Sequence, residues 1–186
     1  FPSHGNCLII GVDELPETRL TAKATNLNSL VQLEKDEEIV ACFDEVKDDT
    51  LVFFTALGNA KRTEGKEFDL RTKKTAAIAL KDDDRVIAVE KQDETAGTVI
   101  MVSKGGMSIR FATDTVPVMG KGAGGVKCMK LDEGDRVIFA AQIADEGEIL
   151  TISDRGYAKR SLVFDYEIQG RNGKGLKTFD FKKNGS

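Results

Sequence analysis

The sequence predicts an all-β domain with a propeller-like arrangement of about four repeats. Three observations lead to this prediction. Short β-rich runs end at glycine turns, no long segment keeps a 3.6-residue apolar period, and one pattern recurs about every 50 residues. Repeats of that length, with about four strands each, are typical of propeller blades. We place the repeats at residues 1–46, 47–93, 97–144 and 147–183 of a single domain that spans 1–186.

The first mark of each repeat is a glycine followed four residues later by an arginine. It occurs in "FFTALGNAKRT" (53–63), "MVSKGGMSIRF" (101–111) and "TISDRGYAKRS" (151–161), which give the pairs Gly58/Arg62, Gly106/Arg110 and Gly156/Arg160. "FPSHGNCLII" (1–10) is a further copy, with Gly5 but with Ile9 in place of the arginine. We expect a hairpin that closes at each glycine.

The second mark is an acidic turn that leads into a β-branched run. "LEKDEEIVA" (33–41), "LKDDDRVIA" (80–88) and "LDEGDRVIF" (131–139) share a leucine and then an acid, which is Glu37, Asp84 or Asp135. Segment 25–40 could form a helix, but its counterparts predict a strand. The first copy lacks its leading strand and the fourth its final strand, so we expect an incomplete or open disk.

Composition excludes several classes of protein. The net charge is −4 but uneven, because residues 1–97 carry −7 and residues 98–186 carry +3. Such a chain can still present a basic surface to a polyanion. No apolar run reaches the ~20 residues of a membrane span, so no membrane partner is expected. His4 is the only histidine and the three cysteines lie far apart, so we expect no catalytic triad and no metal site.

Residues 117–131, "PVMGKGAGGVKCMKL", contain Gly120, Gly122 and Gly125 in the dinucleotide-binding spacing G-x-G-x-x-G. A nucleotide-binding loop follows a strand and begins a helix, whereas here a strand is expected after the loop. The loop also has a counterpart in "GRNGKGLKTFDF" (170–181), so it belongs to the repeat, and we expect no cofactor. A basic, glycine-rich loop can contact phosphates or form a solvated turn, and the residues alone favour neither. A nucleotide-dependent enzyme would rest on this loop only.

Together these motifs resemble the C-terminal domain of the A subunit of bacterial type IIA topoisomerases, DNA gyrase and topoisomerase IV. "VDELPETRLTAKATNLNSLVQLEKDEEIVA" and "GYAKRSLVFDYEIQGRNGKG" look like two blades of that family, and the resemblance covers nearly the whole chain. It implies a β-pinwheel of four-stranded antiparallel blades in which neighbouring repeats exchange a strand. It also implies a non-catalytic domain that binds double-stranded DNA along a basic perimeter and bends or wraps it.

The resemblance further implies a parent protein and its setting. The parent would be an ATP-dependent type II topoisomerase in which the A subunit works with the B subunit, together with a second A subunit. The domain would guide duplex DNA for supercoiling or decatenation by strand passage. The expected location is the bacterial cytoplasm, at the nucleoid.

The sequence departs from the family in two ways. We count four repeats where gyrase domains usually have six. The gyrase heptapeptide Q-R-R-G-G-[KR]-G is matched at five of seven positions, and in the last repeat, by Gln169, Gly170, Arg171, Asn172, Gly173, Lys174 and Gly175. Strong wrapping is therefore not expected.

We expect DNA contacts from the basic residues that the repeat places in turns and loops. They are Lys61, Arg62, Lys73, Lys74, Arg110, Lys121, Lys127, Lys159, Arg160, Arg171, Lys174 and Lys177. Alternatively, the arginines of the Gly-x-x-x-Arg pairs bond to the repeated acid between blades. The competing hypothesis for the whole chain is a propeller-like protein-interaction module that does not bind DNA.

Other residues could be mistaken for functional ones. The resemblance places the topoisomerase nucleophile in another domain, so Tyr157 and Tyr166 are expected to have no catalytic role. Tyr157 follows a turn glycine in a strand and is expected to pack. Five phenylalanines could stack on bases but fall inside strand patterns, so we expect them in the core. They are Phe53, Phe54, Phe111, Phe139 and Phe164.

Overall fold

The computed structural model of the protein describes residues 1–81 and 83–184. Within these residues the strands are short and the only α-helix, α1, is Phe181–Asn184. The strands are β1 (Asn6–Leu8), β2 (Thr50–Thr55), β3 (Asn59–Glu64), β4 (Lys74–Ala76), β5 (Val86–Lys91), β6 (Thr98–Ser103), β7 (Met107–Ala112), β8 (Val126–Lys127), β9 (Val137–Ile143), β10 (Glu148–Ile152), β11 (Ala158–Leu162) and β12 (Leu176–Lys177). Single 3-10 turns lie at Val12–Glu14, Leu27–Ser29, Gly65–Phe68, Thr113–Thr115 and Val163–Asp165. The all-β prediction is confirmed.

The strands form antiparallel sheets that share strands between repeats. One four-stranded sheet has the order β5-β2-β3-β8 and the other has the order β12-β7-β6-β9. In each, three strands come from one repeat and the outer strand, β8 or β12, comes from the next. β4 pairs with β1 in the same way. Among the described residues, the strand exchange of a pinwheel thus occurs three times, twice in four-stranded sheets and once in the two-stranded sheet of β1 and β4.

The hairpin glycines make this exchange possible. Gly58 and Gly106 have φ angles of 79° and 80°, a left-handed conformation that only glycine adopts without strain. A Cβ added at either would lie 2.7 Å from the carbonyl oxygen of Met129 or Phe179, in the incoming strand of the next repeat. Each glycine carbonyl in turn accepts two backbone N–H groups from that strand. The repeated glycine is therefore a junction between repeats as well as a turn.

The two four-stranded sheets pack against each other, and the core lies between and beside them. On β2, Val52 and Phe54 face the sheet of the next repeat, while Leu51 and Phe53 face the first repeat. On β6, Val99 and Met101 face the sheet of the second repeat, while Ile100 and Val102 contact Tyr166 and Ile149 of the fourth repeat. A strand buried on both faces needs a continuous apolar run, which explains "LVFF" in β2 and "VIMV" in β6.

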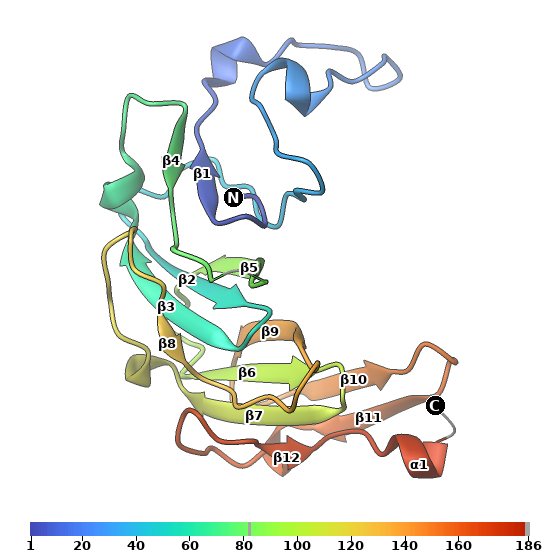
Figure 1. Ribbon diagram of the computed structural model, residues 1–186. Helices are drawn as coiled ribbons and strands as arrows, with labels where there is room; N and C mark the ends of the chain where they lie inside the picture. Colours follow the sequence, from blue (N-terminus) through green and yellow to red (C-terminus); the bar gives the residue numbers. More distant parts are fainter. Residues whose placement is uncertain (82, 185–186) are drawn as a thin grey trace.

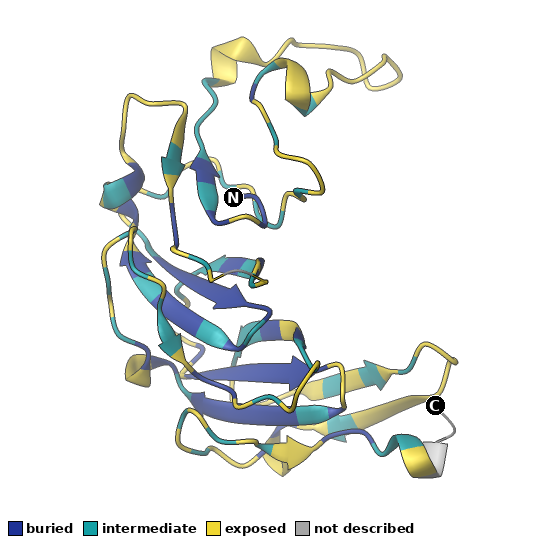
Figure 2. Ribbon diagram, in the orientation of Figure 1, coloured by how far each residue is buried: buried dark blue, intermediate teal, exposed yellow. Residues whose placement is uncertain are grey.

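The repeats follow an open curve rather than a closed ring (Figure 1). The middle two repeats are largely buried, and both ends of the curve are exposed (Figure 2). Among the described residues, the fourth repeat has only the two-stranded sheet β10–β11. An incomplete or open disk was expected from the sequence, and the structure confirms it.

In the first repeat, the prediction of a strand in segment 25–40 is wrong. That segment contains the 3-10 turn Leu27–Ser29, and its only pairing is an isolated bridge between Ile39 and Pro2. The segment has no full strand to pair with. Only the short stretch around Pro2 occupies the position that β2 and β6 occupy in the other repeats. The rejection of a long helix in this segment is confirmed.

Three core predictions in the third and fourth repeats are also wrong. Phe53, Phe54 and Phe111 are buried, but Phe139 is half exposed and Phe164 is 85% exposed. Tyr157, expected to pack, is 50% exposed. These side chains lie on β9 or in the fourth repeat, where no further blade covers them. Within residues 1–81 and 83–184, no helix has the length and apolar character needed to cross a membrane.

Candidate nucleic-acid interface

The repeated acid stabilises the hairpin of its own repeat. Asp84 Oδ1 accepts the backbone N–H of Leu57 at 2.8 Å, and its Oδ2 accepts the amide of Asn59 at 3.1 Å. Asp135 Oδ1 likewise accepts the N–H of Gly105 at 2.9 Å. Hydrogen bonds of this kind occupy turn N–H groups that have no strand partner. The acid therefore does not bond to the repeat arginine, which was one alternative from the sequence.

Two of the repeat arginines hold neighbouring repeats together. Arg110 Nε donates to Thr98 Oγ1 at 2.9 Å, and its Nη1 donates to the carbonyls of Val163 and Tyr166 in the next repeat. Its side chain is only 5% exposed and pairs with Asp145. Arg62 repeats the pattern, because its Nε donates to the carbonyl of Val116 at 2.6 Å. In this structure the guanidinium of Arg110 does not reach the surface, and the partly buried Arg62 is bonded to carbonyls of the next repeat, so we leave both arginines out of the proposed interface.

The third arginine of the series, Arg160, has a different environment. Its side chain is 71% exposed and its Nε lies 3.1 Å from Glu148 Oε1 on the paired strand. Lys159, beside it on β11, is also exposed. Both remain accessible to a polyanion.

Lys61 is fully buried, with 0% of its surface exposed. Its Nζ donates to the carbonyls of Gly120 and Lys121 at 3.0 and 2.9 Å, and it lies 5.4 Å from the centre of the Phe53 ring. Burial lowers the pKa of Lys61 to about 8, and the nearby Glu67 carboxylate partly opposes that shift. Lys61 therefore cannot contact DNA phosphates in this structure, and it too is left out of the proposed interface.

The lowered pKa of Lys61 predicts a rise in stability with pH. Between about pH 8 and the unfolded pKa near 10.5, the unfolded chain holds a proton that the folded chain has released. The free energy of unfolding therefore increases with pH across this window. Because Lys61→Met removes the titration, the wild type should gain up to about 3 kcal/mol relative to the variant between pH 7 and pH 10. Urea unfolding of both proteins at several pH values measures this, and parallel curves would contradict it.

Three further predicted lysines, Lys73, Lys74 and Lys121, are already engaged by other groups of the protein. Lys73 and Lys74 are exposed and pair with Glu14 and Glu34 of the first repeat. Lys121 is half-buried, and its Nζ donates to the carbonyl of Glu67 at 3.3 Å. Ion pairing at Lys73 and Lys74, and partial burial of Lys121, make these weaker sites for phosphate than the sequence suggests.

A basic surface lies where the exchanged strand of the third repeat meets the glycine-rich loop of the fourth. The N–H of Asn172 donates to the carbonyl of Cys128, and the N–H of Lys130 donates to that of Gly173. Arg171 Nη1 donates to the Lys127 carbonyl at 3.2 Å. Four cations from two repeats are thereby brought together, and we call them the junction strip. They are Lys127, Lys130, Arg171 and Lys174.

Acidic neighbours reduce the charge of the junction strip only in part. Lys174 lies 2.5 Å from Asp132, while its side chain stays 57% exposed. Lys127 Nζ donates to the carbonyl of Leu57, a neutral acceptor, at 2.6 Å. Lys177 on β12 is 58% exposed, near Asp180, and extends the basic surface within the fourth repeat.

Sequence reasoning missed Lys130. Its counterparts in the repeat are Ala79 and Asp180, so no repeated lysine marks the position. Only the pairing of segment 127–130 with the loop 170–175 places it among the other cations.

The degenerate heptapeptide forms part of this loop. Asn172 has a φ of 65° at a position where the family pattern has glycine. Asparagine tolerates this left-handed conformation better than most residues. A Cβ added at Gly170 would meet no atom within 4 Å, so a larger side chain fits there.

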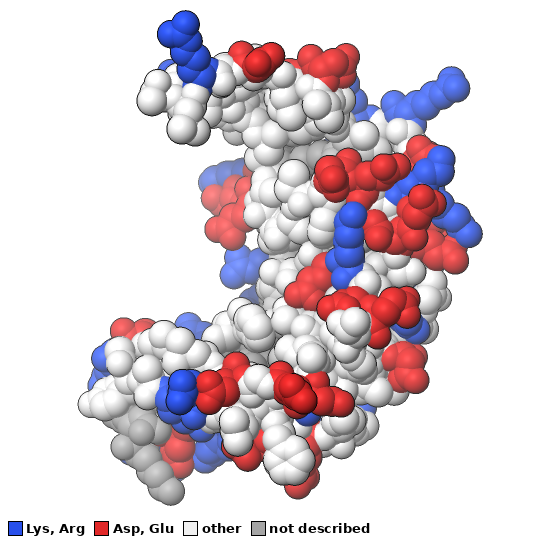
Figure 3. Space-filling model, turned by 180° about the vertical axis from the view of Figure 1, so that it is seen from behind, with Lys and Arg blue, Asp and Glu red and all other residues white. Residues whose placement is uncertain are grey.

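Acidic side chains gather on a different surface. Seen from behind, Asp and Glu residues cluster over the convex side of the molecule (Figure 3). A polyanion would be repelled from that side, which leaves the junction strip as the favoured approach.

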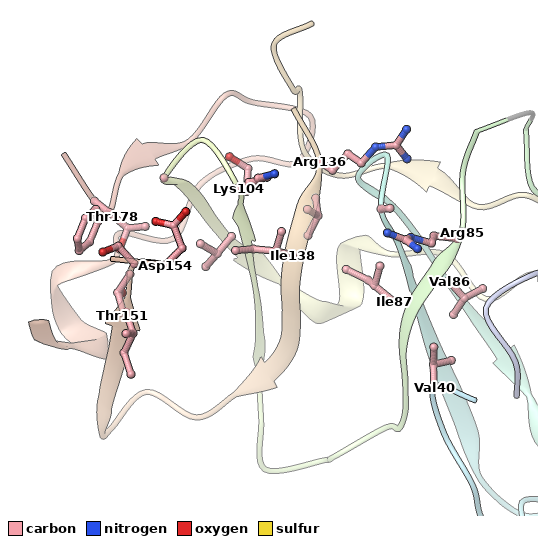
Figure 4. Close-up of a pocket in the computed structure, with 18 of the residues that line it drawn as sticks. Val40, Arg85, Val86, Ile87, Lys104, Arg136, Ile138, Thr151, Asp154 and Thr178 are labelled. Atoms are coloured by element: carbon pink, nitrogen blue, oxygen red, sulfur yellow. The ribbon is translucent and has the colours of Figure 1, made fainter. Parts of the chain in front are cut away.

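The inner side of the curve holds a cavity of about 800 Å³. It is lined by the starts of β5 and β9 and by the hairpin of β10, with apolar walls from Ile87, Ile138 and Ile152. Figure 4 shows Arg85, Arg136 and Lys104 near its rim, with Asp154 across from them. These residues repeat the positions of successive blades, so the cavity is the hub of the open disk.

Comparison with known proteins decides the family. The sequence model of one protein family, described as DNA gyrase C-terminal domain, beta-propeller, matches residues 49–93, 97–144 and 147–186. The chain belongs to the family of DNA gyrase C-terminal domains. Its exchanged-strand blades and its Gly-x-x-x-Arg hairpins are thus features of a gyrase-type repeat.

Individual relatives and structures agree with this family. The A subunit of DNA gyrase from Haloquadratum walsbyi is 34% identical over 99% of this chain and 22% of its own length. A crystal structure of the C-terminal domain of DNA topoisomerase IV superposes with a TM-score of 0.89, at 27% identity, over 95% of this chain and 56% of that one. A gyrase A C-terminal domain gives 0.74 at 27% identity, over 94% and 57%. The chain spans about a fifth of the length of the curated relatives it matches.

Proposed function

We propose that this gyrase-type C-terminal domain binds double-stranded DNA through the junction strip and bends it, without catalysing a reaction itself. It would serve an ATP-dependent type II topoisomerase, whose B subunit, with a second A subunit, processes the DNA that the domain presents. Its place of action would be the cytoplasm, on nucleoid DNA. The observation that carries the proposal is the convergence of four cations from two repeats on one exposed surface.

The chemistry of the strip fits the phosphate backbone rather than the bases. Lysine and arginine side chains on a curved edge can follow successive phosphates, and each contact releases counterions. The strip offers few groups that read base edges in a groove, so binding should depend little on sequence.

An electrophoretic shift with random duplex DNA tests the proposal. We expect a retarded complex that forms equally well on unrelated sequences and dissociates as salt is raised. A strong preference for one sequence, or no complex at roughly 50 mM salt, would count against duplex backbone binding.

A protein-interaction module remains the second candidate. The acid-rich convex side and the exposed apolar residues Ile138, Leu150 and Ile152 favour it. It predicts no shift of DNA at any salt concentration.

The degenerate heptapeptide predicts weak wrapping. Bending a site of 20–30 base pairs by 40–90° costs on the order of 1–6 kcal/mol, which phosphate contacts must exceed. With Gly170 in place of an arginine, the loop loses one such contact. A nicked circle closed by ligase in the presence of the domain should therefore show only a small shift in linking number.

The double variant Gly170→Arg with Asn172→Gly restores the family motif and should enlarge that shift. The open space at Gly170 and the positive φ at Asn172 mean that both changes fit the present backbone. A large shift from the unmodified domain would show that these seven residues do not limit wrapping.

A further inference from the structure

A buried ammonium holds one of the two glycine-rich loops. Lys61 lies on β3 of the second repeat, and its Nζ bonds to the carbonyls of Gly120 and Lys121 in the loop before β8 of the next repeat. β3 and β8 pair through Ala60 and Val126, so the loop leads into the strand at one edge of this hairpin. The outer side of the loop, at Gly122 and Gly124, is exposed.

The same position in the next repeats has no such bond. Counting from the hairpin glycines, the counterparts of Lys61 are Ile109 and Lys159. Ile109 lies beneath the second loop, where a Cβ added at Gly173 would stand 3.4 Å from its Cδ1. Lys159 is exposed. One loop is therefore held by charge and the other by apolar contact, on otherwise equivalent blades.

We propose that Lys61 is a positioning residue, which fixes the loop 120–124 through its carbonyls and so sets where Lys121 is presented to DNA. Two hydrogen bonds from one buried cation hold two successive carbonyls in a fixed orientation. Lys121 then donates its backbone N–H to Glu67 Oε2 at 2.9 Å and its ammonium to the carbonyl of the same residue at 3.3 Å. The effect on DNA rests on the proposed function, whereas the effect on the loop does not.

Amide hydrogen exchange tests the effect on the loop. The substitution Lys61→Ile gives the second repeat the residue that the third repeat carries. We expect exchange at Met119, Lys121 and Ala123 to become about tenfold faster, because the carbonyls lose a charged donor. Exchange in the loop 170–175 should not change. Lys159→Ile, the matched control, removes a charge at the equivalent exposed position and should leave both loops unchanged.

A measurement without mutation covers the case in which Lys61→Ile does not fold. In ¹⁵N-labelled wild-type protein, the Lys61 ammonium should give a separate signal that exchanges slowly with water, since it is buried and bonded. If all lysine ammonium groups exchange rapidly and titrate near 10.5, the ordinary lysine value, the proposed bond is absent and the proposal fails.

A double-mutant cycle tests the effect on DNA. Lys121→Gln should weaken binding about threefold in the wild type, and much less in Lys61→Ile, because the loop is already displaced. Lys159→Ile and Lys121→Gln should act independently. Additive effects of the Lys61 and Lys121 substitutions, or unchanged loop exchange, would overturn the positioning role. If the wild type binds no duplex DNA, the proposed function fails, while the exchange experiment still decides whether Lys61 holds the loop.

Discussion

Replacing Arg110 by methionine should lower the free energy of unfolding by about 3 kcal/mol. The guanidinium is 5% exposed and bonds to Thr98 and to the carbonyls of Val163 and Tyr166. Methionine fills much of the same space, but the Tyr166 carbonyl loses the Arg110 donor and the Val163 carbonyl keeps only the N–H of Tyr166. Urea unfolding followed by circular dichroism measures the change.

Arg160→Met is the matched control, because Arg160 holds the same position in the next hairpin. Its side chain is 71% exposed and its ion pair with Glu148 is on the surface, so the expected change is below about 0.5 kcal/mol. Equal losses in the two variants would mean that Arg110 does not join the third and fourth repeats.

Neutralising the junction strip should nearly abolish DNA binding at moderate salt. The variant carries glutamine at Lys127, Lys130, Arg171 and Lys174. If each cation neutralises one phosphate, the slope of log K against log salt changes by about 3.6 from a wild-type value near −4 to −5. Near 0.1 M salt the affinity should fall on the order of 100- to 1,000-fold. Fluorescence anisotropy with a duplex of about 30 base pairs at several salt concentrations measures both quantities.

A second glutamine variant, at Lys73 and Lys74, tests whether location matters more than charge. Both lysines are exposed but already pair with Glu14 and Glu34, so their removal should change affinity less than about threefold. If neutralising this pair lowers the DNA affinity as much per residue as neutralising the junction strip, the DNA follows the outer edge of the second repeat. Our assignment of the binding surface would then be wrong.

The sequence by itself determined the fold class and the repeat. The spacing of Gly58, Gly106 and Gly156 recurs because each glycine must adopt a positive φ, and the first two also accept the next repeat's strand at close range. Such a constraint is local to one residue, so it is visible in the sequence. The continuous apolar runs of β2 and β6 likewise reflect strands that are buried on both faces.

Only the tertiary structure decided which cations are accessible. Lys61, Ile109 and Lys159 occupy one repeat position, yet Lys61 is buried under a loop and Lys159 is exposed, because burial depends on whether another repeat packs there. Arg110 and Arg160 differ for the same reason. Lys130 joins the junction strip through a pairing between segments more than 40 residues apart, and no local pattern encodes that distance. The sequence specifies the charge of a side chain, but the residues packed around it determine whether it is accessible to DNA.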